Sequence, residues 1–200
     1  MLNKYLEAAQ PPRIVCCFVG KFNPFHKAHY QAYVTLREHF PYVYIVTKLD
    51  SDGFLNAEQK KQLIKLSGVP EKMIKHLVGA GYSIESLAQS VNAVKSNILV
   101  AAFSEKDMEE KGPALLNPPK KGGLPAWRMM PKDPEDMTPI MAEEKNHGYI
   151  YVLPSMKVGV SEVSSSRIRR AIENGNWGLV NKMMATDEAY NFLKDIKDNE

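Results

Sequence analysis

Two histidines three residues apart are the first side chains of this sequence that could do chemistry. They follow an apolar run directly, in the segment Gly20-Lys21-Phe22-Asn23-Pro24-Phe25-His26-Lys27-Ala28-His29. Residues three apart share one face of a helix, and the first turn of a helix attracts anions through its free N–H groups and its dipole. Two imidazoles beside such a site can stabilise charge that develops on phosphate oxygens. This spacing therefore favours a phosphate site beside His26 and His29.

Other site types fit this segment less well. Its glycine spacing matches neither the GxGxxG pattern of dinucleotide folds nor the GxxxxGK[ST] pattern of a phosphate loop. A zinc site would need a third ligand, and no cysteine, histidine or clustered carboxylate lies close to the pair in the sequence. Surface histidines at an ordinary helix start remain the alternative.

A second segment, near the C-terminal end, also favours phosphate. It reads Val163-Ser164-Ser165-Ser166-Arg167-Ile168-Arg169. Hydroxyl and N–H groups at a helix start bind phosphate oxygens, and an arginine one turn later adds a charged fork. A simple N-cap with an exposed basic face is the alternative, but the two segments occur in one chain and support each other.

These two segments resemble the motifs of a known superfamily. Gly20-x-Phe22-x-Pro24-x-His26-x-x-His29 is similar to the signature of the nucleotidyltransferase α/β phosphodiesterases, with Ala28 where glycine is usual. Val163 to Arg169 is similar to the Ile-Ser-Ser-Thr-x-Ile-Arg pattern of nicotinamide and nicotinate mononucleotide adenylyltransferases. The resemblance covers roughly residues 14–172.

The resemblance implies transfer of an adenylyl group from ATP to a phosphate-bearing acceptor, with release of pyrophosphate and with Mg²⁺ bound to ATP. Nicotinamide or nicotinate mononucleotide is the best-matching acceptor. The rivals are a phosphopantetheine adenylyltransferase, a small cytidylyltransferase and a non-catalytic nucleotide-binding or assembly subunit. An Arg-Thr-x-Gly-Ile-Ser segment, usual in cytidylyltransferases, is replaced by Val158-Gly159-Val160-Ser161, which argues against CTP.

The resemblance also assigns roles by position. The catalytic residues are expected to be His26, His29 and Arg169. The nucleotide-binding residues are expected to be Gly20, Lys21, Phe22, Ser164, Ser165 and Ser166. Lys48, after the second strand, and Trp127 are the candidates for acceptor binding, although a loop tryptophan more often anchors its loop. After the third strand, the glycine of the usual Gly-x-Asp pattern is absent, so no role is assigned to Asp107, and no metal ligands are assigned.

Alternating elements must position these residues. Apolar, β-branched runs predict strands at 14–19, 42–47, 97–103 and 149–153. Helical spacing and cap residues predict helices at 27–40, 56–67, 83–94 and 164–175, followed by a tail of two short helices in 176–200. This order predicts an α/β Rossmann-like, doubly wound parallel sheet in one domain spanning 1–200, with its site at the carboxyl ends of the strands.

Prolines are concentrated in one part of the chain. Seven of the 13 fall between Gly112 and Ile140. Such a segment predicts a long loop without regular helix or central strand. Because the two motifs lie on either side of it, we interpret 112–147 as an insert within one fold. The insert is a candidate acceptor lid because it contains several basic residues and a tryptophan, with an ordinary surface loop as the alternative. These residues include Lys120, Lys121, Trp127, Arg128 and Lys132.

Composition limits which kinds of partner and which cellular compartment we expect for the protein. A net charge of +3 is too weak to indicate nucleic-acid or membrane binding. No apolar run approaches a membrane span of about 18 residues, and the first residues lack a signal-peptide pattern. Cys16 and Cys17 are adjacent in a strand, which favours buried, reduced thiols over a disulfide. We expect a cytoplasmic protein that binds small molecules and is free to form a homo-oligomer.

Overall fold

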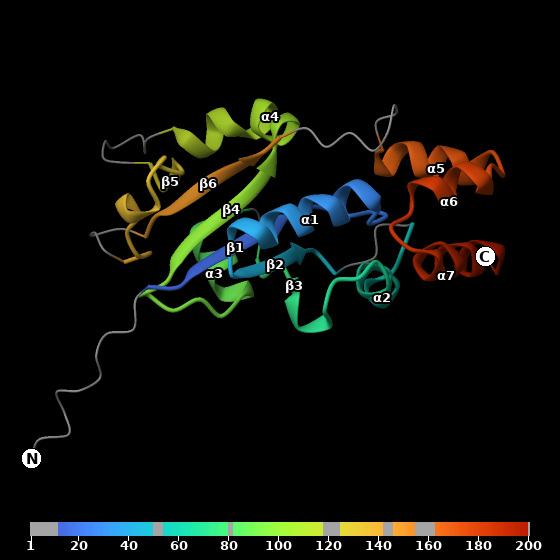
Figure 1. Ribbon diagram of the computed structural model, residues 1–200, viewed down its shortest axis with the longest axis horizontal. Helices are drawn as coiled ribbons and strands as arrows, with labels where there is room; N and C mark the ends of the chain where they lie inside the picture. The colour runs from blue at the N-terminus through green and yellow to red at the C-terminus, as the bar shows by residue number, and fades with distance from the viewer. Residues whose placement is uncertain are drawn as a thin grey trace, which may run out of the picture.

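The structure of the protein is a computed structural model, and it describes residues 12–49, 54–79, 82–117, 125–141, 146–154 and 163–199. One parallel sheet lies at the centre (Figure 1), and its strand order is β3-β2-β1-β4-β6-β5. The strands are β1 (Ile14–Val19), β2 (Tyr42–Thr47), β3 (Ile74–His76), β4 (Ile98–Ser104), β5 (Trp127–Met129) and β6 (Gly148–Leu153). The order reverses between β1 and β4, where open α/β sheets bind ligands. The predicted doubly wound parallel sheet is confirmed.

Both faces of the sheet are buried, as parallel sheets require. Along β1, Cys16 and Phe18 belong to one apolar cluster, while Val15, Cys17 and Val19 belong to another. The helix α1 (Lys27–His39) covers the first cluster, and α3 (Ile84–Ser90) and α4 (Glu105–Leu116) cover the second. Both cysteines are fully buried free thiols, and burial raises their pKa values above the ordinary range.

A third apolar cluster joins α2 (Ala57–Leu66) to the C-terminal helices. These are α5 (Ser165–Glu173), α6 (Trp177–Met183) and α7 (Asp187–Asp198). They gather at one end of the molecule beside α2 (Figure 1). Two short 3₁₀ turns, Glu71–Met73 and Pro134–Asp136, complete the described elements. The predicted pair of tail helices is confirmed as α6 and α7.

Local signals explain where several helices begin and end. Asn56 and Gln59 form a reciprocal capping box at the start of α2, and Gly68 follows the helix with a φ of 99°. Ser83 accepts from the backbone N–H of Ser86 and caps α3. The helix α3 stops at Ser90, four residues before the predicted end.

The prediction that the proline-rich segment contains no regular helix is wrong at its start, while the exclusion of a central strand agrees with the structure. The first five residues of the segment, 112–116, continue α4, with Pro113 inside the helix on its exposed side. The helix survives because Ser104 caps it and because Leu115 and Leu116 pack on the sheet. Further on, Trp127–Met129 forms β5, which pairs with the start of β6. This strand lies at the edge of the sheet, where a proline-rich neighbourhood does least harm.

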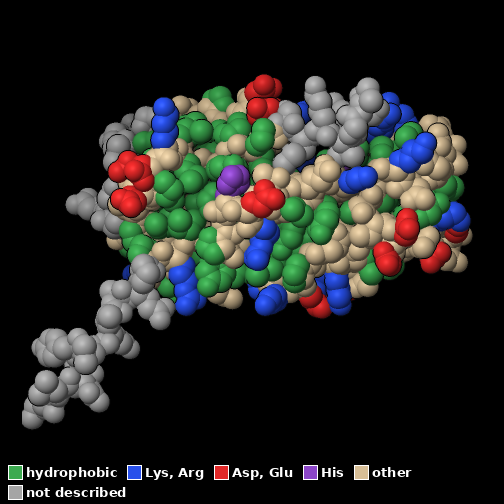
Figure 2. All heavy atoms as spheres, in the orientation of Figure 1, with side chains coloured by type: hydrophobic (Ala, Val, Ile, Leu, Met, Phe, Trp, Pro, Cys, Tyr) green, Lys and Arg blue, Asp and Glu red, His purple; other side chains and the backbone are tan. Residues whose placement is uncertain are grey.

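Parts of that segment, including Pro118, Pro119, Lys120 and Lys121, lie outside the described residues, as does the segment Val158-Gly159-Val160-Ser161. On the face in Figure 2, described acidic and basic side chains are interspersed among apolar ones, in keeping with the small net charge. Among the described helices, none is long and apolar enough to cross a bilayer.

Candidate active site

The loop after β1 is held tightly although it faces a cavity. The N–H of Gly20 donates to the carbonyl of Val46 at 3.3 Å, which ties the loop to β2. Phe22 has a φ of 46°, in the left-handed region that most side chains avoid. Its ring packs edge-on against the rings of Phe18 and Phe25, at centroid distances of 5.1 and 5.5 Å. A Cβ on Gly20 would lie 2.8 Å from the Phe22 ring, so close packing here requires glycine.

The two histidines form a stacked pair at the start of α1. His26 is the N-cap residue with an extended backbone, and His29 lies in the first turn. Their ring centroids are 3.6 Å apart and their planes are inclined by 22°. The Nδ1 atoms of both rings are buried and have no hydrogen-bond partner within the described parts of the chain. The predicted pairing of His26 and His29 on one helix face is therefore present.

Burial keeps both imidazoles neutral in the free protein. It lowers the pKa of His26 from 6.5 to about 3. Burial also lowers the pKa of His29 well below its ordinary value, and the neighbouring charge of His26 adds to this effect. A pair this close resists taking up two protons, whereas an anion beside it would favour the protonated form.

The helix α5 brings the second motif against the first. Ser164 caps this helix by accepting from the N–H of Arg167 at 3.3 Å. The hydroxyl of Ser165 donates to the carbonyl of Pro24 at 3.0 Å, and Nη1 of Arg169 donates to the carbonyl of Asn23 at 2.9 Å. The two segments that sequence reasoning singled out are thus in direct contact.

A cavity of about 1010 Å³ opens at the carboxyl ends of β1 and β4. Its volume lies at the upper end of the range typical of ligand sites. Six of the residues expected to act on the nucleotide line it: Gly20, Lys21, Phe22, His29, Ser165 and Arg169. The structure therefore gathers residues from both motifs around one space large enough for a nucleotide.

The remaining predicted residues lie elsewhere. His26 stacks on His29 and does not line the cavity. Ser164 and Ser166 line a separate cavity of about 370 Å³ with Arg167 and Arg170. Lys48 is exposed at the end of β2, with its carbonyl 3.5 Å from Nζ of Lys60.

Trp127 is a core residue rather than part of a loop over the cavity. It is 3% exposed, it pairs with Gly148 at the first position of β6, and its Nε1 donates to the carbonyl of Tyr82 at 2.9 Å. Trp127 is linked to the site through the backbone of Tyr82, a residue that does line the cavity. The structure thus places Trp127 in an anchoring position.

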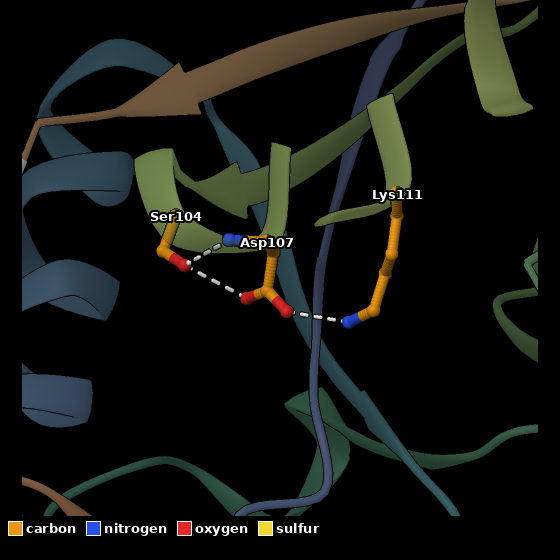
Figure 3. A network of polar contacts seen from close by, with 3 residues as sticks. All are labelled: Ser104, Asp107 and Lys111. Atoms are coloured by element: carbon orange, nitrogen blue, oxygen red, sulfur yellow. Dashed lines mark hydrogen bonds and ion pairs between the residues drawn. The ribbon is translucent and has the colours of Figure 1, made fainter. Parts of the chain in front are cut away.

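Sequence reasoning missed a polar network of Ser104, Asp107 and Lys111 (Figure 3), three residues that line the cavity. The hydroxyl of Ser104 accepts from the N–H of Asp107 at 3.1 Å and donates to its carboxylate at 2.8 Å. Nζ of Lys111 donates to the other carboxylate oxygen and lies 5.4 Å from the ring centroid of Tyr82. Burial opposes the charge on Lys111, but the hydrogen bond and charge of Asp107 raise its pKa above the ordinary value.

One signal for this network was present in the sequence. Ser104 and Asp107 have the spacing of an N-cap and its third residue, and they directly follow a buried strand. No group of three or more described His, Cys, Asp or Glu side chains could hold a metal ion. The carboxylate of Asp107 is instead used within the network.

No protein-family model and no curated protein sequence matches this chain. Solved structures do match its fold. Nicotinic acid mononucleotide adenylyltransferase of Plasmodium falciparum, complexed with NaAD, aligns with a TM-score of 0.62 and 11% identity over 94% of this chain and 98% of that one. A nicotinate-nucleotide adenylyltransferase described as putative, from Vibrio parahaemolyticus, aligns at 0.54 and 13% identity over 90% and 99%.

A third structure is a bifunctional NMN adenylyltransferase/ADP ribose pyrophosphatase from Francisella tularensis. It aligns with a TM-score of 0.59 and 17% identity, over 94% of this chain and 50% of that chain. The present chain therefore spans about half the length of the bifunctional protein. Another structure of that protein is complexed with AMP and a manganese ion. By its strand order, its C-terminal helices and these likenesses, the chain has the fold of the mononucleotide adenylyltransferases.

Proposed function

We propose that the protein transfers an adenylyl group from ATP to a phosphate-bearing small molecule and releases pyrophosphate. The observation that carries this proposal is the meeting of the two motifs at one cavity. His29 comes from the first motif, Ser165 and Arg169 come from the second, and all three line the same space. A histidine, a hydroxyl and a guanidinium around one cavity match the ligands that a polyphosphate needs.

The reaction requires no nucleophile from the protein. An oxygen of the acceptor phosphate attacks the α-phosphorus in line, the bond from that phosphorus to the bridging oxygen breaks, and pyrophosphate leaves with the electron pair. Catalysis then comes from positioning and from stabilisation of the developing charge. Magnesium enters as part of the MgATP substrate.

Each side chain has a role that follows from its place. His29 faces the cavity and would bind the α-phosphate, where negative charge increases during attack. Ser165 and Arg169 would bind the β- and γ-phosphates and the departing pyrophosphate. His26 does not reach the cavity, so its role is to support the ring of His29. Gly20 leaves room for the Phe22 ring and lets the nucleotide approach the backbone.

For the acceptor, we propose nicotinate or nicotinamide mononucleotide. The second motif is most similar to enzymes that use these acceptors, and two of the structural neighbours carry nicotinate names in their descriptions. The neighbours share 11–17% of their residues with this chain, and such distant similarity supports the fold more strongly than the substrate.

A pyrophosphate-release screen tests the proposal. ATP and CTP are crossed with nicotinate mononucleotide, nicotinamide mononucleotide, phosphopantetheine and a polyol phosphate. We expect release with ATP and one of the two mononucleotides, dependent on both substrates. Release with another pair would correct the acceptor or the nucleotide. ATP binding without acceptor-dependent release from any pair would instead show a nucleotide-binding subunit that kept the fold.

A further inference from the structure

The C-terminal helix α7 is tied to both ends of α2. The hydroxyl of Thr186, at the start of α7, donates to the carbonyl of Leu66 at 2.7 Å. Nζ of Lys197, in the last turn of α7, donates to the carbonyl of Phe54 at 2.7 Å. The two helices lie side by side (Figure 1), and their apolar side chains share one cluster. The helix α7 therefore braces the segment that leads into α2.

Lys197 makes a second contact with the same residue. Its ammonium lies 4.4 Å from the centroid of the Phe54 ring, a distance at which a cation is attracted to an aromatic face. One lysine thus holds both the backbone and the ring of Phe54. Phe54 is partly buried, and it is one of the residues that line the large cavity.

The contact is not needed to start α2. Asn56 and Gln59 already satisfy the first turn of that helix through their reciprocal hydrogen bonds, at 2.8 and 2.9 Å. Phe54 lies two residues before this cap, so Lys197 fixes a residue outside the helix. What the contact fixes is the place of an aromatic ring at the cavity wall.

We propose that Lys197 is a positioning residue, which holds the Phe54 ring so that it stacks on the planar ring of a substrate. This inference rests on the proposed function. The ring could belong to the adenine base or to the heteroaromatic part of the acceptor, and both share the chemistry that an aromatic side chain recognises. The residues that we propose bind phosphate, His29, Ser165 and Arg169, come from α1 and α5. Phe54 precedes α2 and lines the same cavity, so its ring is a candidate for a contact with the ring of a substrate.

Lys194 provides a matched control on the same helix. Its ammonium pairs with Asp198 and lies 5.6 Å from the ring centroid of Trp177. Lys194 does not line the cavity. Lys197→Met and Lys194→Met remove the same charge from the same helix, each from beside an aromatic ring, and differ in whether that ring lines the cavity.

The experiment compares both variants with Phe54→Leu and with the double variant Lys197→Met/Phe54→Leu. We expect Lys197→Met to raise the KM of one substrate about tenfold with little change in kcat, because base–aromatic stacking is lost. If the KM of ATP rises, the adenine base is the ring that stacks on Phe54, and if the KM of the acceptor rises, it is the ring of the acceptor. The double variant should be no worse than Phe54→Leu, since both changes remove one contact. Lys197→Arg, which keeps the charge and donors, should restore most of the affinity.

Calorimetric titration with the non-hydrolysable analogue of ATP, and with the mononucleotide, measures the same comparison without turnover. If the wild type binds but transfers nothing, and Lys197→Met still weakens binding, the proposed reaction fails and the positioning role stands. If Lys197→Met behaves like Lys194→Met in KM and in both titrations, the inference is wrong. Additive effects in the double variant, or a wild type that binds neither ligand, would also overturn it. Melting temperatures identify any variant that has lost its fold. If Lys197→Met has done so, the substrate affinity of Lys197→Arg, compared with that of the wild type, tests the inference instead.

Discussion

The imidazole ring of His29 lies almost parallel to that of His26, with 3.6 Å between the ring centroids. The two histidines look equivalent in the sequence, but this stacking places them differently relative to the cavity. His29 reaches the cavity, while His26 lies behind it as the N-cap of α1. Because burial holds the free pair neutral, a polyphosphate entering the cavity supplies the negative charge that favours protonation.

Replacing His29 by alanine tests the group nearest to the expected α-phosphate. We expect the rate of pyrophosphate release to fall by about 10²–10³, because a donor to the developing charge is lost. His39→Ala is the control, since His39 lies at the other end of α1 and contacts the ring of Tyr151. Steady-state kinetics with ATP and the acceptor measure both variants. An unchanged rate in His29→Ala would remove His29 from the mechanism.

Stability should fall as the pH is lowered through the range in which an unfolded histidine becomes charged. The pKa of His26 is about 3 in the folded protein and 6.5 ordinarily, so below pH 6.5 the unfolded state binds more protons. The contribution is complete above this value and is lost progressively toward pH 3. Between about pH 7.5 and about pH 5, His26 alone should cost about 2 kcal/mol of unfolding free energy.

Urea unfolding at the two pH values measures this loss, and His26→Gln identifies its source. The variant should lose less stability than the wild type over the same interval, by about the His26 contribution. Equal losses in the two proteins would show that His26 is not the group responsible.

Arg169 lines the cavity, and its guanidinium donates to the carbonyl of Asn23, so Arg169 belongs to the proposed site and also joins the two motifs. Arg169→Ala should lower kcat/KM about 10²-fold or more. Arg169→Lys should recover part of this loss, since lysine keeps the charge without the planar fork. Arg170→Ala is the control, because Arg170 is exposed and lines the smaller cavity. Similar kinetics for the two alanine variants would contradict the assignment.

Trp127→Phe should reduce stability more than activity. The substitution removes the N–H that donates to the carbonyl of Tyr82, and a lost buried partner costs about 1–3 kcal/mol. The KM of the acceptor should change little, because the indole does not line the cavity. Chemical unfolding measures the loss of stability, and steady-state kinetics on the same preparation measure the KM of the acceptor. A large rise in acceptor KM at unchanged stability would instead return Trp127 to the binding site.

Much of the fold could be predicted because its signals are local. The strand at 14–19, the N-cap at Asn56 and the serine cap of α5 depend on neighbouring residues, and all three are present. By contrast, β5 has three residues and gains its stability from pairing with β6, so no periodicity reveals it. Pro113 argues against a helix in the sequence, but the C-terminal turn of α4 is stabilised by packing on the sheet.

The same distinction applies to the site. Both motifs could be found, but which serine of the second one lines the cavity depends on how α5 docks. Ser165 donates to Pro24, whereas Ser164 and Ser166 line the smaller cavity. Phe54 and Tyr82 carry no pattern in the sequence, because their places are set by connections between distant elements.

The contacts between α5 and the first loop also determine when the site can exist during folding. The bonds from Arg169 to Asn23 and from Ser165 to Pro24 join residues 146 and 141 positions apart. Contacts of such high sequence separation form late, because closing a long loop costs entropy before any contact compensates. During synthesis, the first motif emerges long before the second. The end of the cavity that we propose binds phosphate therefore needs nearly the whole described chain to be in place.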